Sequence, residues 1–513
     1  MEDHVHSVDV PILHDVFKLK ISKKTIDCVV DLYPTHIEYR QVDTPDDQSV
    51  LMEGSVQFTD AIGCHTGRRK KKSSKDDVFA YLTIYSYPLK DSGKKRRRTS
   101  TCFRINKNDN VRHNQDTANL WRVAILCRLR GIDFSHELGT NQYPPEYRYV
   151  IFVNPKSGTG KSRKIFKNVP KRMLREAEAE YTLITTERQG HAYDYVKEMK
   201  LNQVDGIIIV SGDGLIHEVI NGLMSREDWE HAIKLPIGAL PGGSGNALYQ
   251  SILYESKEPT SITSAMFMII KRYTTKLDLV SITTLKDQRY SFLSVGWGLL
   301  SDVDIGTEKF RKLGTARFVL GTVKHLTKLK YYHGKFQYLP NPMKEDDTGN
   351  TSSNNANQTN DTATAGATNN TESKAGPKSI LPPINESLPS TWETVEDDMV
   401  LFGAIYLPYL STENFVAPTS RLNDGIIHLQ TIDSTCNRKT MLKILSKQKE
   451  AGHLGMSCVE VFPCKAFRLE PITSPGIITV DGECVDYGTI QGEIFPGLSR
   501  VFCRRAKSSS SSS

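Results

Sequence analysis

The sequence predicts a mixed chain in which a parallel α/β sheet follows a smaller antiparallel sheet and precedes a mostly β region. From Tyr147 onward, near-continuous apolar strands alternate with glycine turns and helices, which is typical of parallel sheets covered on both faces. After about Lys276, strand-like segments dominate. Before Gly131, short stretches of period-two hydrophobicity alternate with turn-rich pieces. The 513 residues are enough for these three parts, each with its own core.

The N-terminal extension is expected at residues 1–145. Segments such as FKLKIS, HIEYRQV, SVQFTDAI and TCFRI predict antiparallel strands, and TANLWRVAILCRLRG places apolar residues at helical spacing. Several strands closed by one amphipathic helix that contains a tryptophan resemble a pleckstrin-homology domain. This resemblance implies a PH-like extension.

Two basic runs lie in this extension, RRKKK at 68–72 and KKRRR at 94–98, within a chain of formal net charge +7. Such runs suit an anionic membrane, a nucleic acid or a nuclear import receptor, although charge runs are also common in solvated loops. We predict a basic surface in peripheral contact with anionic membranes and no nucleic-acid partner. A nuclear pool and a homodimer are both compatible with the sequence.

The chain reads as cytoplasmic. No apolar run approaches the ~20 residues that cross a bilayer, and the first residues are acidic and polar where a signal peptide is basic and then apolar. The 9 cysteines are scattered without a C-x-x-C pair, which argues against a disulfide framework and a zinc site.

The parallel α/β part is expected at 146–278, with four turns at the carboxyl ends of its strands: NPKSGTGKS, ERQG, SGDG and PGGSGN. In such sheets ligands bind at this edge. The first turn ends like a P-loop, but Pro155 stands where that motif needs glycine, and proline fixes φ and has no N–H. We therefore exclude a P-loop, although two lysines and a following helix N-terminus still suit an anion.

Asp213 stands between two glycines at the end of the buried strand IIIVS. The glycines allow a bulky ligand to approach the backbone. An isolated G-D-G turn is more simply a helix cap, but Gly243 to Asn246 follow the next strand and could line the same crevice.

The region 279–505 reads as a β-rich, sandwich-like part. It is interrupted at 341–394 by a segment rich in Asn, Thr, Ser, Ala and Pro, which we expect to be disordered because it buries too little apolar surface to fold. The serine tail at 506–513 is also expected to be disordered.

The motifs NPKSGTGKS, SGDGLIHEVINGL and LPGGSGNAL, in this order on successive strands, resemble the catalytic domain of the diacylglycerol kinase and sphingosine kinase superfamily. Diacylglycerol kinases typically carry GGDGT, whereas SGDGL and MSREDWEHAIKLPIGALPGGSGNAL resemble sphingosine kinases. The likeness continues through FLSVGWGLLSDVDIGTEKFRKLGTARFVLGT, RLNDGIIHL and VDGE, so it covers Tyr149 to about Phe502 apart from the insert. It implies phosphorylation of a lipid primary hydroxyl by Mg-ATP and a lipid-binding role for the β-rich part.

Within this resemblance Asp213 corresponds to the catalytic aspartate, a base that takes the hydroxyl proton during phosphoryl transfer. Arg311 and Arg317 suit a charge clamp on phosphate oxygens, although each alone is more simply a solvated arginine. Asp481 and Glu483 could reach Mg²⁺ directly or through water, although VDGE alone is more often a hairpin turn. The family carries a second arginine where this chain has Gln189. The implied nucleotide contacts are Asn154, Pro155, Lys156, Thr186, Glu187, Arg188, Gln189, Gly190, Glu218, Gly243, Ser244, Gly245, Arg311, Arg317, Asp481, Gly482 and Glu483.

The implied substrate contacts are Ser211, Gly212, Gly214, Ser294 and Asp304. Asp304 matches the family's sphingosine-binding acid, and it shares one face with Asp302 if this segment is extended. A protonated amine can pair with a buried carboxylate, whereas the amide of ceramide and the ester of diacylglycerol cannot. Sphingosine is therefore favoured as substrate. A ceramide or diacylglycerol kinase and a non-catalytic membrane lipid sensor stay open as alternatives.

Downstream, RFVLGTVKHLTKLKYY sets apolar residues at helical spacing with lysines between them. Most such stripes are core-facing helices. The alternative is a lid or a membrane-facing helix over the lipid entrance.

Overall fold

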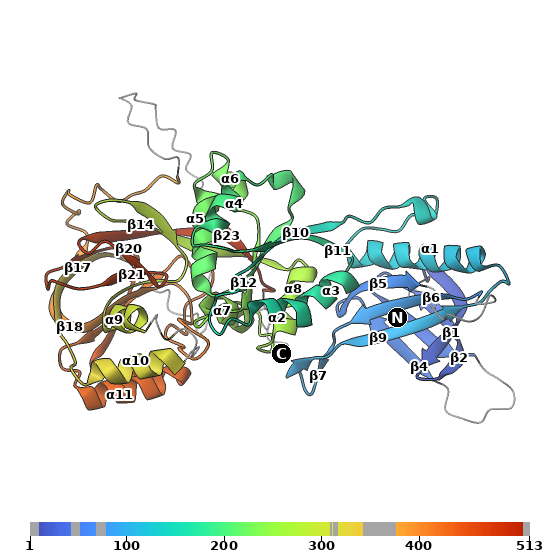
Figure 1. The fold of residues 1–513 in the computed structure, drawn as a ribbon, viewed down its shortest axis with the longest axis horizontal. Helices are drawn as coiled ribbons and strands as arrows, with labels where there is room; N and C mark the ends of the chain where they lie inside the picture. Colours follow the sequence, from blue (N-terminus) through green and yellow to red (C-terminus); the bar gives the residue numbers. More distant parts are fainter. Residues whose placement is uncertain are drawn as a thin grey trace, which may run out of the picture.

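The computed structural model describes residues 10–42, 52–67, 78–307, 310, 316–341 and 376–505, and the side chains of 316–319 are outside this description. Three parts follow one another along the molecule (Figure 1): an antiparallel sheet in blue, a helix-covered sheet in green, and a β-rich part in yellow to red. The mixed α/β class with large sheets is the one predicted from the sequence.

The N-terminal part is a seven-stranded antiparallel sheet in the order β4-β3-β2-β1-β9-β6-β5. Helix α1 closes it through Trp121, whose ring meets the ring of Phe17 edge-on at 5.1 Å. The segment SVQFTDAI, expected as one strand, is divided between β4 and β5, because the chain turns where the amide of Asp60 bonds to the carbonyl of Gln57. The PH-like assignment stays a prediction. The elements are β1 (Leu13–Ile21), β2 (Lys24–Leu32), β3 (His36–Gln41), β4 (Glu53–Gln57), β5 (Ala61–Gly67), β6 (Ala80–Ser86), β7 (Leu89–Lys90), β8 (Lys95–Arg96), β9 (Thr99–Ile105) and α1 (Val111–Leu129).

The basic run at 94–98 does not lie wholly on the expected solvent-facing surface. The side chain of Arg96 is 2% exposed, and it donates to the Glu258 carboxylate from Nε at 2.8 Å and from a terminal nitrogen at 2.7 Å. Its guanidinium also lies 3.7 Å from the ring centroid of Phe267. A buried charge needs such partners, so Arg96 joins the N-terminal sheet to the central part. The run at 68–72 lies outside the described residues.

The central part is a parallel sheet in the order β11-β10-β12-β13. Val153 pairs with Val210, and Val210 pairs with Leu240, so neighbouring strands end at the same edge. Helices α4 and α5 pack together on one face, and α2 and α3 lie on the other (Figure 1). The four predicted turns therefore meet at one edge. The elements are β10 (Tyr147–Val153), α2 (Ser162–Asn168), α3 (Pro170–Glu176), β11 (Ala179–Thr185), α4 (His191–Glu198), β12 (Gly206–Ser211), α5 (Asp213–Met224), α6 (Trp229–Ala232), β13 (Ile237–Pro241), α7 (Ala247–Glu255) and α8 (Ile262–Ile270).

The central sheet continues into the β-rich part. The last strand, β23, pairs in parallel with β13 at Ile237 and Val501 and antiparallel with β14 from Thr274 and Phe502 onward. Strand β14 runs through residue 278, where the sequence predicts a boundary, and the sandwich form stays a prediction. The elements are β14 (Thr274–Thr283), β15 (Gln288–Ser291), β16 (Ser294–Gly298), α9 (Leu299–Gly306), α10 (Ala316–Leu326), β17 (Tyr332–Pro340), β18 (Glu393–Ile405), β19 (Ile427–Asp433), α11 (Arg438–Lys447), β20 (Val459–Pro471), β21 (Ile478–Val480), β22 (Glu483–Val485) and β23 (Ile490–Phe502).

Part of the segment expected to be disordered is ordered. Residues 376–394 are described, and those at 379–386 bond to side chains of β20 and β23. The amide of Ile380 donates to Glu493 at 3.1 Å, and Arg468 donates to the carbonyl of Glu386 at 2.5 Å. Composition alone misses this packing, because buried Glu493 and Arg468 need polar partners and the segment supplies them. Residues 342–375 lie outside the described part.

Helices α9 and α11 were not predicted in the β-rich part. Strand β16 ends at Gly298, which adopts φ +75°, and α9 begins at the next residue. A Cβ at Gly298 would lie 2.7 Å from the carbonyl of Val400, so this strand-to-helix turn requires glycine. Within the part of the chain that the structure describes, none of the helices combines the length and apolarity that a membrane span needs.

Candidate active site

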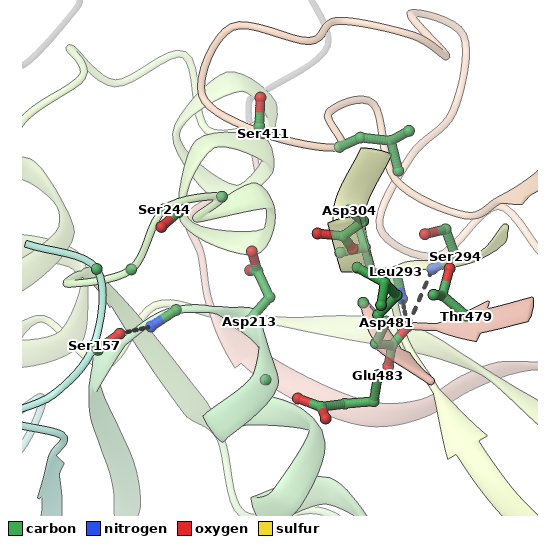
Figure 2. A pocket seen from close by; sticks show the side chains of 18 of the residues that line it. Ser157, Asp213, Ser244, Leu293, Ser294, Asp304, Ser411, Thr479, Asp481 and Glu483 are labelled. Atoms are coloured by element: carbon green, nitrogen blue, oxygen red, sulfur yellow. Dashed lines mark hydrogen bonds between the residues drawn. The ribbon is translucent and has the colours of Figure 1, made fainter. Parts of the chain in front are cut away.

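A cavity of about 600 Å³ lies between the carboxyl edge of the parallel sheet and the β-rich part. Figure 2 shows Asp213 and Ser244 on one side of it and Ser294, Thr479 and Asp304 on the other. The structure thus brings together residues that the sequence separates by more than 200 positions. The predicted site residues that line the cavity are Asn154, Lys156, Thr186, Glu187, Arg188, Gln189, Ser211, Gly212, Asp213, Gly214, Glu218, Gly243, Ser244, Gly245, Ser294, Asp304, Asp481, Gly482 and Glu483.

Glycines allow the turns after β10, β12 and β13 to touch backbone to backbone. A Cβ at Gly158, where φ is +51°, would lie 2.9 Å from the carbonyl of Gly242, and a Cβ at Gly243 would lie 2.3 Å from the Cα of Gly212. The amide of Gly212 donates to Ser157 Oγ at 3.2 Å (Figure 2). The three turns therefore form one floor, where backbone N–H groups and helix N-termini suit a phosphate chain.

Asp213, the first residue of α5, is 9% exposed. Its Oδ2 accepts the amide of Ala247 at 2.9 Å, and its Oδ1 accepts the amide of Leu248 at 3.2 Å, so it caps α7 and not its own helix. Burial raises the pKa of this carboxyl to about 6, against the lowering effect of the two amides. At neutral pH Asp213 is therefore mostly ionised and able to accept a proton.

Activity is expected to fall with decreasing pH below about 6. The raised pKa of Asp213 means that only about a tenth of the side chain stays ionised at pH 5, and only the ionised form can act as a base. Measuring kcat/KM for lipid phosphorylation from pH 5 to 8 at saturating ATP checks this. The residual phosphate transfer of Asp213→Asn is expected to show no such fall in activity below pH 6. A wild-type kcat/KM that stays constant down to pH 5 would contradict the prediction.

Three cavity carboxylates each lie against a glycine of a predicted motif. A Cβ added at any of these glycines would come so close to the carboxylate that the carboxylate would have to shift. The distances from an added Cβ to the nearest carboxylate oxygen are 2.9 Å from Gly245 to Asp213, 3.0 Å from Gly482 to Asp304, and 3.0 Å from Gly214 to Glu483. The glycines thus make room for functional side chains as well as for a ligand.

The carboxylate of Asp481 accepts hydrogen bonds from five donors of the protein. Five donors exceed the roughly four lone-pair positions of a carboxylate, so little capacity is left for a direct metal contact. Asp481 directly follows β21, adopts a left-handed φ of +50° and is 4% exposed. The donors are Ser291 Oγ at 2.6 Å, the amides of Phe292, Leu293 and Ser294 at 3.2, 3.0 and 3.1 Å, and His217 Nδ1 at 2.8 Å.

Glu218 lies on α5, facing the start of α4. Burial raises the pKa of its carboxyl, and the backbone N–H groups of Gly190 and Ala192 oppose that shift. Its Oε2 is buried without a hydrogen-bond partner among the described residues. In the turn after β11, Arg188 donates to Asp194 at 2.5 Å. Both Glu218 and Arg188 line the cavity, as predicted for the nucleotide side.

The predicted geometry of Asp302 and Asp304 is wrong. The segment is helix α9 and not extended, so residues two apart point to different sides. Asp302 is buried and accepts the hydroxyl of Tyr332, whereas Asp304 lines the cavity. The helix thus leaves only Asp304 of the pair to face a ligand.

Two predicted nucleotide residues that the structure describes in full do not line the cavity. Pro155 and Gly190 lie in the turns but contribute no lining surface. Arg311 lies outside the described residues, and Arg317 falls in α10 where its side chain is not described. The proposed arginine clamp stays a prediction.

Much of the lining escaped sequence reasoning, above all an apolar region between α9 and α11. A helical period in LLSDVDIG could have indicated α9, but so short a segment fits a strand pattern equally well. Helix α11 comes more than 130 residues later and carries no local sign of the cavity. Ser157 and Thr479 were also missed. The apolar lining includes Leu299, Leu300, Val303, Ile305, Leu401, Val416, Met441 and Leu445.

Residues 148–282 match the family model of the diacylglycerol kinase catalytic domain. The fold and the site thus define a catalytic domain of the lipid-kinase class. The chain is 31% identical to sphingosine kinase 2 of Homo sapiens, over 87% of this chain and 84% of that protein. It is 35% identical to sphingosine kinase 1 of Rattus norvegicus over 69% of this chain and 90% of that protein, and 34% identical to sphingosine kinase 1 of Arabidopsis thaliana over 66% and 69%. The chain belongs to the sphingosine kinase family, and the predicted resemblance is confirmed.

Proposed function

We propose that this chain transfers the γ-phosphate of ATP to the primary hydroxyl of sphingosine and related sphingoid bases, giving sphingosine 1-phosphate. The observation that carries the substrate assignment is Asp304, a carboxylate that lines the cavity beside the apolar region. A protonated amine can pair with this charge at the cavity wall, whereas the amide of ceramide and the ester of diacylglycerol have no positive charge to offer it. Family membership supports the same substrate.

In the proposed reaction the nucleotide phosphates lie on the floor formed by the three glycine turns, near Lys156. Asp213 accepts the proton of the lipid hydroxyl as the acceptor oxygen bonds to the γ-phosphorus. The bond between that phosphorus and the bridging oxygen of ADP breaks in the same transfer. Such a reaction needs positioning and charge stabilisation more than covalent catalysis.

The residues present fit a magnesium ion that arrives with ATP. No group of three or more His, Cys, Asp or Glu side chains in the described residues is arranged to hold a metal. Mg²⁺ keeps several waters and takes one or two carboxylates besides the phosphates, so a dedicated protein cage is not required. Glu483, which lines the cavity against Gly214, would hold the ion directly or through water. When bound, Mg²⁺ neutralises charge on the transferred phosphoryl group.

We also propose that this cytoplasmic chain contacts anionic membranes peripherally through α10 and α11. Leu326 of α10 packs with Met441 of α11 in one apolar cluster, which places the helices beside each other (Figure 1). On their outer sides Leu320, Val323 and Leu442 are 56%, 52% and 51% exposed. Exposed apolar side chains interspersed with lysines suit a bilayer surface. Exposed Val323 supports the membrane-facing alternative for the predicted stripe, whereas Leu326 and Leu329 pack in the apolar cluster, as the core-facing interpretation expects.

The experiment that tests the proposed function compares sphingosine, ceramide and diacylglycerol in mixed micelles with labelled ATP and Mg²⁺. Sphingosine is expected to be preferred in kcat/KM by about tenfold or more, because a hydrogen bond between charged groups contributes roughly 1.5–3 kcal/mol and only sphingosine brings a charged donor. Preference for a neutral lipid would favour a ceramide or diacylglycerol kinase. Absence of transfer to any of the three would favour a membrane lipid sensor.

A further inference from the structure

Helix α5 carries a polar stripe that continues beyond Asp213. His217 and Asn221 follow at successive four-residue steps, so all three lie on one face of the helix. Asn221 makes a two-way contact with Tyr290: its Nδ2 donates to the Tyr290 carbonyl at 2.8 Å, and the Tyr290 amide donates to its Oδ1 at 2.8 Å. The stripe therefore runs from the base Asp213 to the segment that enters the β-rich part.

His217 makes the next contact along this stripe. Its Nδ1 donates to Asp481 Oδ2 at 2.8 Å, with the side chains of His217 and Asp481 11% and 0% exposed. A hydrogen bond to a charged and fully buried acceptor is among the stronger ones in proteins. His217 does not line the cavity, so it does not touch a ligand there.

Asp481 also binds the loop on the substrate side of the cavity. Its carboxylate accepts three consecutive amides, from Phe292 to Ser294, and its own amide donates to the Ser294 carbonyl at 2.8 Å. Ser294 lines the cavity opposite Asp213 (Figure 2). The bond from His217 therefore connects the helix that carries the base to the loop that faces the acceptor.

We propose that His217 is a positioning residue that fixes the distance and direction between Asp213 and the lipid hydroxyl by joining α5 to the Asp481-centred loop. This inference rests on the proposed function. Misplacement of reacting groups by about 1 Å can cost about 100-fold in rate, so a residue outside the cavity can control kcat in this way.

The test compares His217→Leu, which removes the donor at similar volume, with His217→Asn, whose amide can donate near the position of Nδ1. His217→Leu is expected to lower kcat for sphingosine by about 10- to 100-fold, with KM for ATP within about twofold of wild type. His217→Asn is expected to restore most of the loss. Exposed His231 on α6 supplies the matched control, since His231→Leu is expected to leave kcat unchanged.

The variant Ser291→Ala distinguishes a positioning role of His217 from a role in stability alone. This change also removes one hydrogen bond from Asp481, but that bond lies within the β-rich part and does not involve α5. The kcat of Ser291→Ala is expected to stay well above that of His217→Leu, even if the two variants lower the melting temperature by the same amount. Equal kcat losses in the two variants, or wild-type kcat in His217→Leu, would overturn the proposal.

His217→Gln is a second test that protects folding, because it keeps a polar side chain but displaces the donor. Its kcat is expected to fall below that of His217→Asn, and a wild-type value would count against the proposal. If the wild-type protein did not phosphorylate sphingosine, the proposed function itself would be wrong. If the wild type were active and His217→Leu were equally active, only the proposed role of His217 would be wrong.

Discussion

Replacing Asp213 with asparagine is expected to reduce phosphate transfer to a small residual rate while leaving ATP binding nearly intact. The amide has similar size and can still accept one of the amides of Ala247 and Leu248, but it cannot take the hydroxyl proton. General base catalysis contributes about 10²- to 10⁴-fold, so kcat is expected to fall by that factor. Labelled phosphate transfer measures kcat, and equilibrium binding of a non-hydrolysable ATP analogue measures nucleotide affinity.

Asp228 supplies the control for this change, because it is a carboxylate next to α6 that does not line the cavity. Asp228→Asn is expected to keep wild-type kcat. Wild-type turnover in Asp213→Asn would show that the side chain is not the base. Parallel loss of turnover and ATP binding would show instead that its cap on α7 dominates its role.

The second large effect is expected from Asp304→Asn. The change removes the charge that pairs with the amine of sphingosine but keeps the size of the side chain. Truncating one partner of such a charge pair typically costs about 2–5 kcal/mol, so kcat/KM for sphingosine is expected to fall by roughly 30-fold or more. Neutral lipids lose no such pair, so their relative rate is expected to rise.

The neighbouring carboxylate Asp302 is the matched control. It accepts the hydroxyl of Tyr332 inside the protein and does not line the cavity. Asp302→Asn is expected to lower the melting temperature while leaving the ratio of sphingosine to ceramide phosphorylation unchanged. If Asp304→Asn kept the wild-type ratio, or if Asp302→Asn changed it, the amine-carboxylate basis of selectivity would be wrong.

Local sequence was enough to predict most of the architecture. Hydrophobic period distinguishes strands from helices, and parallel strands end at one edge of a sheet, so the order of the motifs alone assigns SGDG and PGGSGN to one crevice. Asp213 could be assigned to it for the same reason, since it follows a buried strand directly, whereas Glu218 was implied only by the family resemblance. The crevice was therefore predictable from local pattern, and the resemblance of its motifs to a known family supplied the class of protein.

The substrate side was less predictable, because its residues come from distant elements. Met441 and Leu445 reach the cavity from α11, and Thr479 reaches it from β21. No pattern within α11 shows which of its apolar residues face a cavity and which face the core, since both kinds follow the same helical period. The extended geometry predicted for Asp302 and Asp304 failed for a related reason: the short segment fits strand and helix patterns equally well.

The sequence by itself determined which residue types carry the chemistry and which turns present them, because motifs and periodicity are local. Only the tertiary structure decided which polar groups are already satisfied. In the structure, Asp481 accepts hydrogen bonds from a loop and from His217, and Arg96 donates to Glu258. Strand β23 also returns to the central sheet beside β13. The physical reason is that burial, hydrogen-bond partners and charge compensation depend on contacts between residues far apart in the chain.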